Sequence, residues 1–338
     1  MNIEKSLLFD DVCIPTEREI KQGWEGREIL VSVILLTYNQ EYYVDNAIAG
    51  ILRQQTQFPF EIVIHDDAST DGTRAKLAAY KEKYPSLIKL IQQTENQYSK
   101  SPNSVLTLSF SVAEGKYLAY CEGDDYWVDS EKLQLQYDTL DSTPGCQICF
   151  HSAYHLVAGQ ELKVVYHLPE SAHLTCSEMI LADSLLCPSA SLFFSKSVLS
   201  KLDAISEFVV GDFFLRVLLS VSNGSMYLHK PMSVYRVQSA GSWTEKIAGH
   251  EKLIAFVDAF ARDIESFKGQ MPAAYHSDLD ILKSRYCRLV LSNRSISVET
   301  RRRFFERNKV SLSMLDVVKW LFLYKRDFSF SVVRRRAK

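Results

Sequence analysis

Adjacent carboxylates follow an apolar run in the stretch KYLAYCEGDDYW, residues 116–127. Glu122, Asp124 and Asp125 repel one another, which costs free energy unless a cation or water offsets their charge. Hard cations such as Mn2+ and Mg2+ take carboxylate oxygens, often from one or two side chains together with substrate phosphates. The motif is therefore either a metal site, with Asp125 on the cation and Asp124 on a sugar or ribose hydroxyl, or an exposed acidic turn before a helix.

A second acidic stretch, HDDASTDGT at 65–73, also follows an apolar run. Its acids resemble a calcium-binding loop, but such a loop needs a bidentate Glu at its last position, where Ala78 stands. Asp71 is predicted to cap the helix that follows. Asp66 and Asp67 remain at the strand end, where a carboxylate suits the imide N–H of uracil or a ribose hydroxyl.

Two further candidates lie in the second half of the chain. Asp212 opens a predicted helix in GDFFLRVLL, and it is either the N-cap or, kept ionised by the helix N-terminus, a general base. An ion pair with Arg216, one turn further on, is a competing explanation for Asp212. Arg236 in VYRVQSAGSW offers a clamp for a diphosphate. The Ser- and Gly-containing loop after it either closes over a bound nucleotide or is a surface turn.

Hydrophobic patterning predicts the scaffold that positions these residues. Apolar, β-branched segments alternate with segments of helical spacing, which predicts an α/β fold with a doubly wound, mostly parallel sheet. In such sheets, ligands bind beyond the carboxyl ends of the strands. The polar clusters at 37–39, 65–73 and 122–127 are therefore expected to meet in one crevice. Strands are expected at 29–39, 60–65, 86–93 and 115–121, and helices at 43–54, 73–83 and 103–114.

Beyond residue 150 the pattern is looser. The segment SMYLHKPMSVYRVQ at 225–238 is predicted to form a short hairpin, and helices are expected at 245–265 and 275–291. The seven cysteines are odd in number and irregularly spaced, so we expect free thiols in a reducing compartment. Cys146 and Cys149 lie in an alternating strand pattern and face opposite ways, which argues against a zinc half-site.

The N-terminus lacks the basic and long apolar segments of a signal peptide, and no apolar run is long enough to span a membrane. These features predict a cytoplasmic protein. Residues 301–338 contain twelve Lys and Arg and three acids, although the net charge of the chain is −2. This tail either lies on an anionic membrane surface or forms a terminal helix packed on an acidic body. We do not expect a nucleic acid partner, because no recognition motif accompanies the tail.

The motifs VSVILLTYN, EIVIHDDASTDGT, GKYLAYCEGDDYW and GDFFLRV closely resemble, in this order, those of the family 2 glycosyltransferases, and the resemblance covers roughly residues 30–245. It implies the Rossmann-like GT-A fold and an inverting glycosyltransferase (EC 2.4). Such an enzyme moves a hexosyl or N-acetylhexosaminyl group from a nucleotide-diphosphate sugar, usually a UDP-sugar, to an acceptor hydroxyl. The resemblance also implies manganese or magnesium (Mn2+ or Mg2+) as cofactor. It further implies bacterial O-antigen or capsule synthesis on a polyprenyl-diphosphate-linked acceptor, at the inner face of the membrane.

The same resemblance assigns the site residues. Asp125 would bind the metal, with Asp124 nearer the ribose and sugar. Asp212 would be the catalytic base, and Gly211 before it means that the acid found there in many members is absent. Arg236 stands in a stretch similar to YR-x-H, with Gln238 where His is common. The residues expected to bind the nucleoside are Thr37, Tyr38, Asn39 and Asp67.

The implied organisation is a lead-in at 1–28, a GT-A catalytic domain at 29–245 and a helical C-terminal region with a basic tail at 246–338. Within the catalytic domain, 29–130 would bind the nucleotide and 131–245 the acceptor.

Two other functions compete with this one. A sugar nucleotidyltransferase would need a Gly-rich basic loop after the first strand, where this chain has TYNQEYYVDN. A non-catalytic nucleotide- or sugar-binding protein would tolerate the loss of Asp125 or Asp212, and both are present. No Walker loop, GxSxG or GxGxxG motif occurs, so kinase, hydrolase and dehydrogenase functions have no support.

Overall fold

The chain forms two compact units, residues 1–240 and 241–338. The computed structural model describes residues 13–101, 104–157, 160–166, 168–182, 186–197, 199, 208–237, 249–309, 312, 317, 318, 320 and 322.

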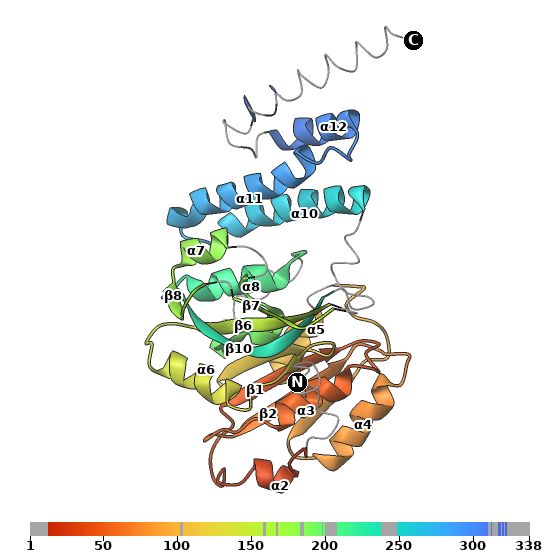
Figure 1. Cartoon of the computed structure of the whole chain (residues 1–338), viewed down its shortest axis with the longest axis vertical. Coiled ribbons are helices and arrows are strands. Elements are labelled where there is room, and N and C mark those ends of the chain that lie inside the picture. The colour runs from red at the N-terminus through yellow and green to blue at the C-terminus, as the bar shows by residue number, and fades with distance from the viewer. Residues whose placement is uncertain are drawn as a thin grey trace. The chain divides into compact units, whose positions relative to one another are not determined.

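A ten-stranded sheet organises the first unit, with strand order β3-β2-β1-β4-β9-β6-β10-β5, β7 beside β6 and β8 beside β10 (Figure 1). The strands β1 to β4 are mutually parallel, which confirms the predicted α/β fold with a doubly wound, mostly parallel sheet. Antiparallel pairings of β9, β7, β8 and β5 complete the other half. The strands are β1 (Val31–Thr37), β2 (Phe60–Asp66), β3 (Ile88–Gln92), β4 (Tyr117–Glu122), β5 (Tyr126–Trp127), β6 (Ile148–Val157), β7 (Lys163–Val165), β8 (Ala172–Leu174), β9 (Phe193–Ser195) and β10 (Ser225–Val237).

The predicted hairpin at 225–238 is wrong, because β10 runs through this segment as one strand. It pairs in parallel with β6 on both sides of an irregularity between Leu228 and Ser233. Between these two paired positions, four residues of β10 (229–232) stand against one residue of β6, Ser152. Pro231 lies within this stretch and has no N–H to give to the ladder, so the break that it suggests in the sequence is a bulge rather than a turn.

Helices cover both faces of this sheet. Apolar side chains of α3 (Val44–Leu52), α4 (Thr73–Lys83) and α6 (Lys132–Asp141) join one buried cluster with β1, β2 and β4. The opposite face carries α5 (Ser104–Val112) and α8 (Gly211–Ser220), the latter packed against β6. Shorter helical segments are α2 (Glu17–Ile20), α7 (Cys176–Leu181) and η2 (Ser189–Ser191).

The approach of α3 to the sheet depends on Gly50. A Cβ at this position would lie 2.4 Å from the main-chain oxygen of Trp127, so only glycine fits there. The contact fixes β5, which directly follows the carboxylates at 122–125. Burial of both faces explains why β1, β2 and β4 are continuous apolar runs in the sequence.

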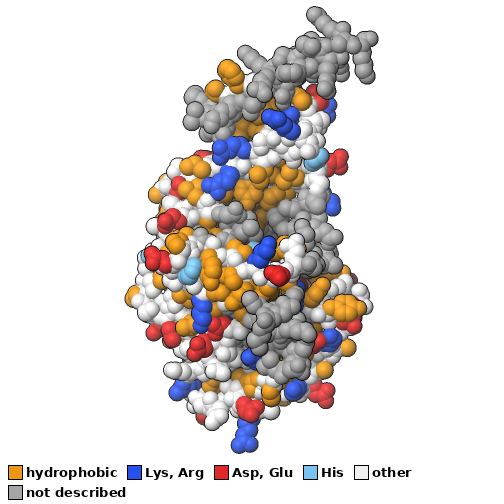
Figure 2. All heavy atoms as spheres, viewed as in Figure 1, with side chains coloured by type: hydrophobic (Ala, Val, Ile, Leu, Met, Phe, Trp, Pro, Cys, Tyr) orange, Lys and Arg blue, Asp and Glu red, His pale blue; other side chains and the backbone are white. Residues whose placement is uncertain are grey.

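The second unit is helical, as expected for the C-terminal region. Its elements are α10 (His250–Lys268), η4 (Ala273–Tyr275), α11 (His276–Leu291) and α12 (Val298–Asn308). A buried cluster around Val290, Phe304 and Phe305 holds the helices together. Hydrophobic side chains also gather on the surface over α10 and α11 in Figure 2. Within the described part of the chain, none of the helices has the length and apolar character needed to cross a membrane.

Candidate active site

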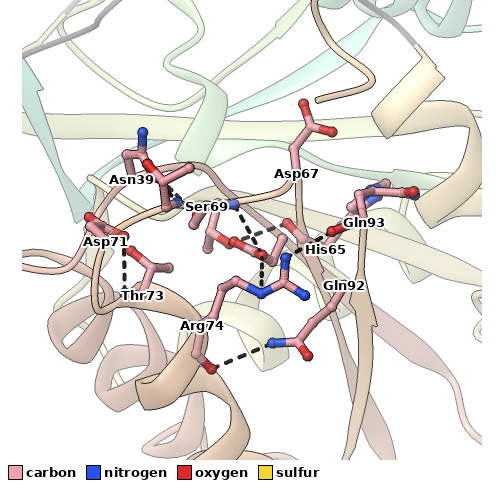
Figure 3. Close-up of polar contacts among 12 residues, drawn as sticks. Asn39, His65, Asp67, Ser69, Asp71, Thr73, Arg74, Gln92 and Gln93 are labelled. Carbon is pink, nitrogen blue, oxygen red and sulfur yellow. Dashed lines mark hydrogen bonds and ion pairs between the residues drawn. The ribbon is translucent and has the colours of Figure 1, made fainter. Parts of the chain in front are cut away.

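The loops after β1 and β2 are bound to each other by their polar side chains (Figure 3). The N–H of Asn39 donates to Ser69 Oγ at 2.9 Å, and Asn39 Oδ1 accepts the N–H of Thr70 at 2.8 Å. Asp71 does not hold the predicted N-cap position of α4, which is occupied by Gly72, but its Oδ1 accepts the N–H of Thr73 at 3.0 Å. Polar side chains at the carboxyl edge of the sheet thus hold together the two loops that form one wall of the site.

Two residues of these loops adopt left-handed backbone conformations. The φ angle is 53° at Asn39 and 64° at Ala68. Asparagine tolerates this region better than alanine, whose Cβ crowds the following carbonyl oxygen. Backbone strain is therefore concentrated at the two strand ends where the polar clusters meet.

Asp66 and Asp67, adjacent in the sequence, have different hydrogen-bond partners. Asp66 is fully buried, accepts the N–H of Ser69 at 3.3 Å and lies 3.8 Å from Arg74 Nε. Asp67 points away from this group, and its Oδ1 and Oδ2 accept the backbone N–H groups of Gln97 at 2.6 Å and of Tyr98 at 2.9 Å. Asp67 thus binds the segment after β3 to the end of β2.

The other predicted nucleoside residues are placed as follows. Thr37 is buried at the end of β1, and its Oγ1 donates to the carbonyl of His65 at 3.3 Å. Tyr38 is 47% exposed on the loop after β1. The N–H of Asp67 donates to the carbonyl of Thr37 at 3.0 Å. Gln238 is outside the described residues.

The turn that carries the paired carboxylates packs tightly against β1. The N–H of Gly123 donates to the carbonyl of Leu36 at 2.8 Å, and a Cβ at Gly123 would lie 2.1 Å from Gln40 Oε1. Asp124 is half-buried, whereas Asp125 is only 1% exposed. The two adjacent carboxylates therefore occupy different environments.

One oxygen of Asp125 is satisfied and the other is not. Oδ1 accepts the main-chain N–H of Arg236 at 2.9 Å, while the buried Oδ2 has no hydrogen-bond partner among the described residues. Burial, and then the charges of Asp124 and Glu122, raise the pKa of Asp125 well above its usual value. The guanidinium of Arg236 donates through Nη1 to the main-chain oxygen of Asp124.

Glu122 and Asp212 lie beside this turn. Tyr120 Oη and Ser189 Oγ donate to the two carboxylate oxygens of Glu122 at 3.2 and 3.3 Å. Burial, followed by the charges of Asp124 and Asp212, raises the pKa of Glu122 to about 7. Asp212 is in the first turn of α8, and Val210 holds the N-cap position. The simple N-cap explanation for Asp212 is therefore wrong.

The same charges act on tyrosines around the site. Burial first, and then the charges of Asp125, Glu122, Asp124 and Asp212, raise the pKa of Tyr235. Burial, Glu122 and Asp212 also raise the pKa of Tyr98. Asp212 thus lies close enough to Glu122 for their charges to interact, although the two residues are far apart in the sequence.

From the sequence, Glu122 has no assigned role, and Tyr98 and Ser189 are not identified as part of this region. Glu122 has a detectable signal, because it ends the apolar run of β4 and directly precedes the turn that carries Asp124 and Asp125. No signal in the sequence marks Tyr98 or Ser189, because their positions depend on loops that are fixed by Asp67 and by η2. Arg216, considered from the sequence as an ion-pair partner of Asp212, is 3% exposed. Its guanidinium carbon lies 5.0 Å from the Phe213 ring centroid.

The carboxylates are suited to a divalent cation. Asp125 Oδ2 is a buried oxygen without a hydrogen-bond partner, and Asp124 and Glu122 add negative charge beside it. Among the described residues, no group of three or more His, Cys, Asp or Glu side chains forms a complete metal site. A cation on Asp125 would therefore need further ligands from substrate phosphates, as is usual for Mg2+.

Comparisons with known proteins agree with this geometry. The glycosyl transferase family 2 model matches residues 32–202, half of the chain. An uncharacterized protein of Mycobacterium tuberculosis H37Rv is 33% identical over 223 residues, which are 63% of this chain and 60% of that relative. The chain thus spans about 60% of the length of the first curated relatives it matches.

A glucosyltransferase of Escherichia coli, WfgD, is named for transfer from UDP-Glc to α-D-GlcNAc-diphosphoundecaprenol. It is 32% identical over 109 residues, 32% of this chain and 40% of WfgD. Two solved structures share the fold. Residues 1–349 of Staphylococcus aureus TarS in complex with UDP have a TM-score of 0.57 at 18% identity, covering 86% of this chain and 78% of that fragment. A Pyrobaculum calidifontis mannosyltransferase with GDP-Man and Mn2+ has a TM-score of 0.53 at 14% identity, covering 93% of this chain and 86% of its own. The chain belongs to glycosyl transferase family 2 and has the GT-A fold.

Proposed function

We propose that this glycosyltransferase moves a sugar from a nucleotide-diphosphate donor, a UDP-sugar, to an acceptor hydroxyl with inversion. The observation that carries the proposal is the meeting of Asp212 with the carboxylates of the EGDD turn. UDP is supported by the TarS complexes with UDP and UDP-GlcNAc and by the donor named for WfgD. A hexose or an N-acetylhexosamine is the expected sugar.

The donor would lie across the carboxyl edge of the sheet. Thr37, Tyr38, Asn39 and Asp67 belong to the wall beside β1 and β2, where we place the nucleoside. Asp125, and Asp124 beside it, would hold Mn2+ or Mg2+, which when bound neutralises the diphosphate and so favours its departure. The mannosyltransferase complex with Mn2+ supports this choice of cofactor.

Asp212 would act on the acceptor. Its carboxylate takes the proton of the acceptor hydroxyl while that oxygen forms a bond to the anomeric carbon from the face opposite the nucleotide. The bond between the anomeric carbon and the diphosphate oxygen breaks, and its electrons leave with the nucleoside diphosphate. An α-linked donor then yields a β-glycoside.

We propose that the acceptor is a glycan on a polyprenyl-diphosphate lipid in bacterial surface polysaccharide synthesis. The acceptor named for WfgD and the teichuronic acid pathway named for Bacillus subtilis TuaG support this class. A lipid-linked acceptor would keep the enzyme at the inner face of the cell membrane. The alternative acceptor is a soluble glycan.

The C-terminal tail offers a contact with such a membrane. Trp320 is buried and stacks on Phe305 at 4.1 Å, while Val318 and Phe322 are 52% and 79% exposed. Residues 301–338 also carry twelve Lys and Arg against three acids. We propose that exposed apolar side chains and basic charge together bind an anionic bilayer. Vesicles with phosphatidylglycerol should retain the protein at low salt, and vesicles of phosphatidylcholine alone should not.

The experiment that tests the function is donor turnover by the purified chain. UDP-glucose, UDP-N-acetylglucosamine, UDP-galactose, GDP-mannose and dTDP-sugars are each incubated with Mn2+ or with EDTA, and release of the nucleoside diphosphate is measured. The proposal expects release from at least one UDP-sugar, with metal only. Release from none of the donors, with an intact fold and with a lipid-linked acceptor added, would contradict it.

A further inference from the structure

The contacts of Arg236 differ from those expected of a diphosphate clamp. We propose that Arg236 is a positioning residue, which fixes the Asp124–Asp125 turn in the shape that receives the donor, rather than a ligand of the phosphates. The inference rests on the proposed function for its consequence in catalysis. The positioning itself can be tested without any nucleotide.

Strand pairing brings Arg236 to the turn. In the antiparallel pair of β10 with β5, Ser233 stands opposite Trp127 and Val234 opposite Tyr126. This pairing ends at Tyr126, and Arg236, two residues after Val234 on β10, lies beside the turn that precedes β5. The position of Arg236 therefore follows from the sheet.

Both the backbone and the side chain of Arg236 hold the turn. The main-chain N–H donates to Asp125 Oδ1 at 2.9 Å, and the guanidinium donates to the main-chain oxygen of Asp124. The first bond holds the Asp125 carboxylate so that Oδ2 is the oxygen left without a partner. The second bond fixes the peptide that joins the two acids, and with it the direction of the Asp124 side chain.

Two aromatic rings hold the guanidinium in turn. Its carbon lies 4.9 Å from the ring centroid of Tyr43 and 4.6 Å from that of Tyr126. Tyr126 is buried at the start of β5, and Tyr43 precedes α3 on the loop after β1. Arg236 therefore connects the turn to the loop beside the nucleoside wall. A lysine could keep the charge but not the planar contact with the rings and the fixed hydrogen bond.

The two roles predict different effects of substitution. A clamp contacts the phosphates directly, so Arg236→Lys would weaken UDP binding in EDTA and leave the turn unchanged, and removal of the Tyr43 ring would matter little. A positioning residue needs its planar group and its neighbours, so Arg236→Lys and Tyr43→Leu should loosen the same turn. Tyr43→Phe keeps the ring and is the matched control.

The first measurement is hydrogen exchange of the peptide that spans residues 121–127 in the free protein. We expect at least tenfold faster exchange at this turn in Arg236→Lys and in Tyr43→Leu, and no change in Tyr43→Phe. Exchange at β2 serves as the internal reference for an intact fold. Unchanged exchange of the turn in Arg236→Lys would overturn the proposal, whatever the protein binds.

The second measurement distinguishes an altered turn from the loss of a direct contact with the phosphates. Binding of Mn2+ in the presence of UDP is followed by electron paramagnetic resonance, and binding of UDP and of uridine in EDTA by calorimetry. We expect Arg236→Lys and Tyr43→Leu to weaken Mn2+ binding about tenfold and to leave UDP affinity in EDTA unchanged. A loss of UDP affinity in EDTA, with uridine affinity retained, would assign Arg236 to the phosphates instead. If the unsubstituted protein binds no nucleotide, the proposed function fails while the exchange result still decides the role of Arg236.

Discussion

Asp67 Oδ2 accepts the backbone N–H of Tyr98 at 2.9 Å, across the gap between the end of β2 and the segment after β3. The other oxygen of the carboxylate accepts the N–H of Gln97 at 2.6 Å. The Tyr98 side chain is 42% exposed, and the charges of Glu122 and Asp212 add to burial in raising its pKa. Asp67 thus joins the wall of the proposed nucleoside site to a tyrosine beside the proposed catalytic base.

Asp67→Asn should loosen this connection. An amide has one acceptor oxygen, and its NH2 group would face one of two backbone donors, so one hydrogen bond is lost and one donor is left unsatisfied. We expect a lower free energy of unfolding by about 1–3 kcal/mol and faster hydrogen exchange at 95–101. Urea unfolding and exchange mass spectrometry measure the two effects. Full protection of 95–101 in the variant would show that Asp67 does not hold the segment.

Ala68→Gly should stabilise the protein. Ala68 has a φ angle of 64°, and relieving a left-handed alanine is worth about 1 kcal/mol. Asn39→Gly is the matched control, because it relieves a similar φ angle of 53° but removes the oxygen that binds the Thr70 N–H. We expect the free energy of unfolding to rise in Ala68→Gly and to fall in Asn39→Gly. A fall in both would show that the strain at Ala68 is small.

Lys132 should make stability depend on pH. Its Nζ is fully buried, donates to Gln136 Oε1 at 2.7 Å and lies 3.9 Å from the Trp127 ring centroid. Burial lowers the pKa of Lys132 to about 7, against the opposing influence of Cys121, Cys149 and Asp129. An unfolded lysine titrates near 10.4, so the unfolded chain binds more protons above pH 7 and the free energy of unfolding rises with pH.

The expected slope is at most about 1.4 kcal/mol per pH unit. Lys132→Met keeps an unbranched apolar chain without the charge and should remove this contribution. Urea unfolding between pH 6.5 and 8.0, a range below the ordinary pKa of about 8.5 for thiols, compares the two proteins. Equal slopes would mean that Lys132 is charged in the folded protein throughout this range.

Asp212→Asn should remove the catalytic base and leave the donor site intact. We expect kcat to fall by about 10²–10⁴-fold, with little change in the KM for the donor. Asp212→Glu is the control, since it keeps a carboxylate on the same turn of α8 and should retain more activity than Asn. A variant Asp212→Asn with full kcat would assign proton removal to another group, with Glu122 the next candidate.

The sequence predicts the parallel half of the fold well, because β1, β2 and β4 are buried on both faces and their patterns are continuous apolar runs. The meeting of their polar ends also follows from the topology, and it is confirmed by the pairing of Leu36 with Glu122 and of Thr37 with Asp66. The irregular course of β10 is not predictable in this way. Pro231 marks a break, but pairing with β6 and β5 decides what form the break takes.

The candidate site, like the fold, can be predicted from the sequence only in part. Asp124, Asp125 and Asp212 are identified from residue type and position at the ends of elements. The hydrogen bond from the main-chain N–H of Arg236 to Asp125 cannot be predicted from the sequence, because a main-chain donor does not depend on the residue type. Tyr98 is missed for a related reason, since its place depends on hydrogen bonds to Asp67 rather than on a periodic pattern.

The most direct test of the central claim is thermal unfolding of the purified protein with UDP, in Mn2+ and in EDTA. A ligand at a hundred times its dissociation constant stabilises a protein by about 2.7 kcal/mol. Our account predicts that UDP raises the melting temperature more with Mn2+ than in EDTA, and that Asp125→Ala removes this metal-dependent increase. No shift with UDP, GDP or dTDP under any of these conditions would contradict the account, and the EGDD turn would then be only an acidic turn.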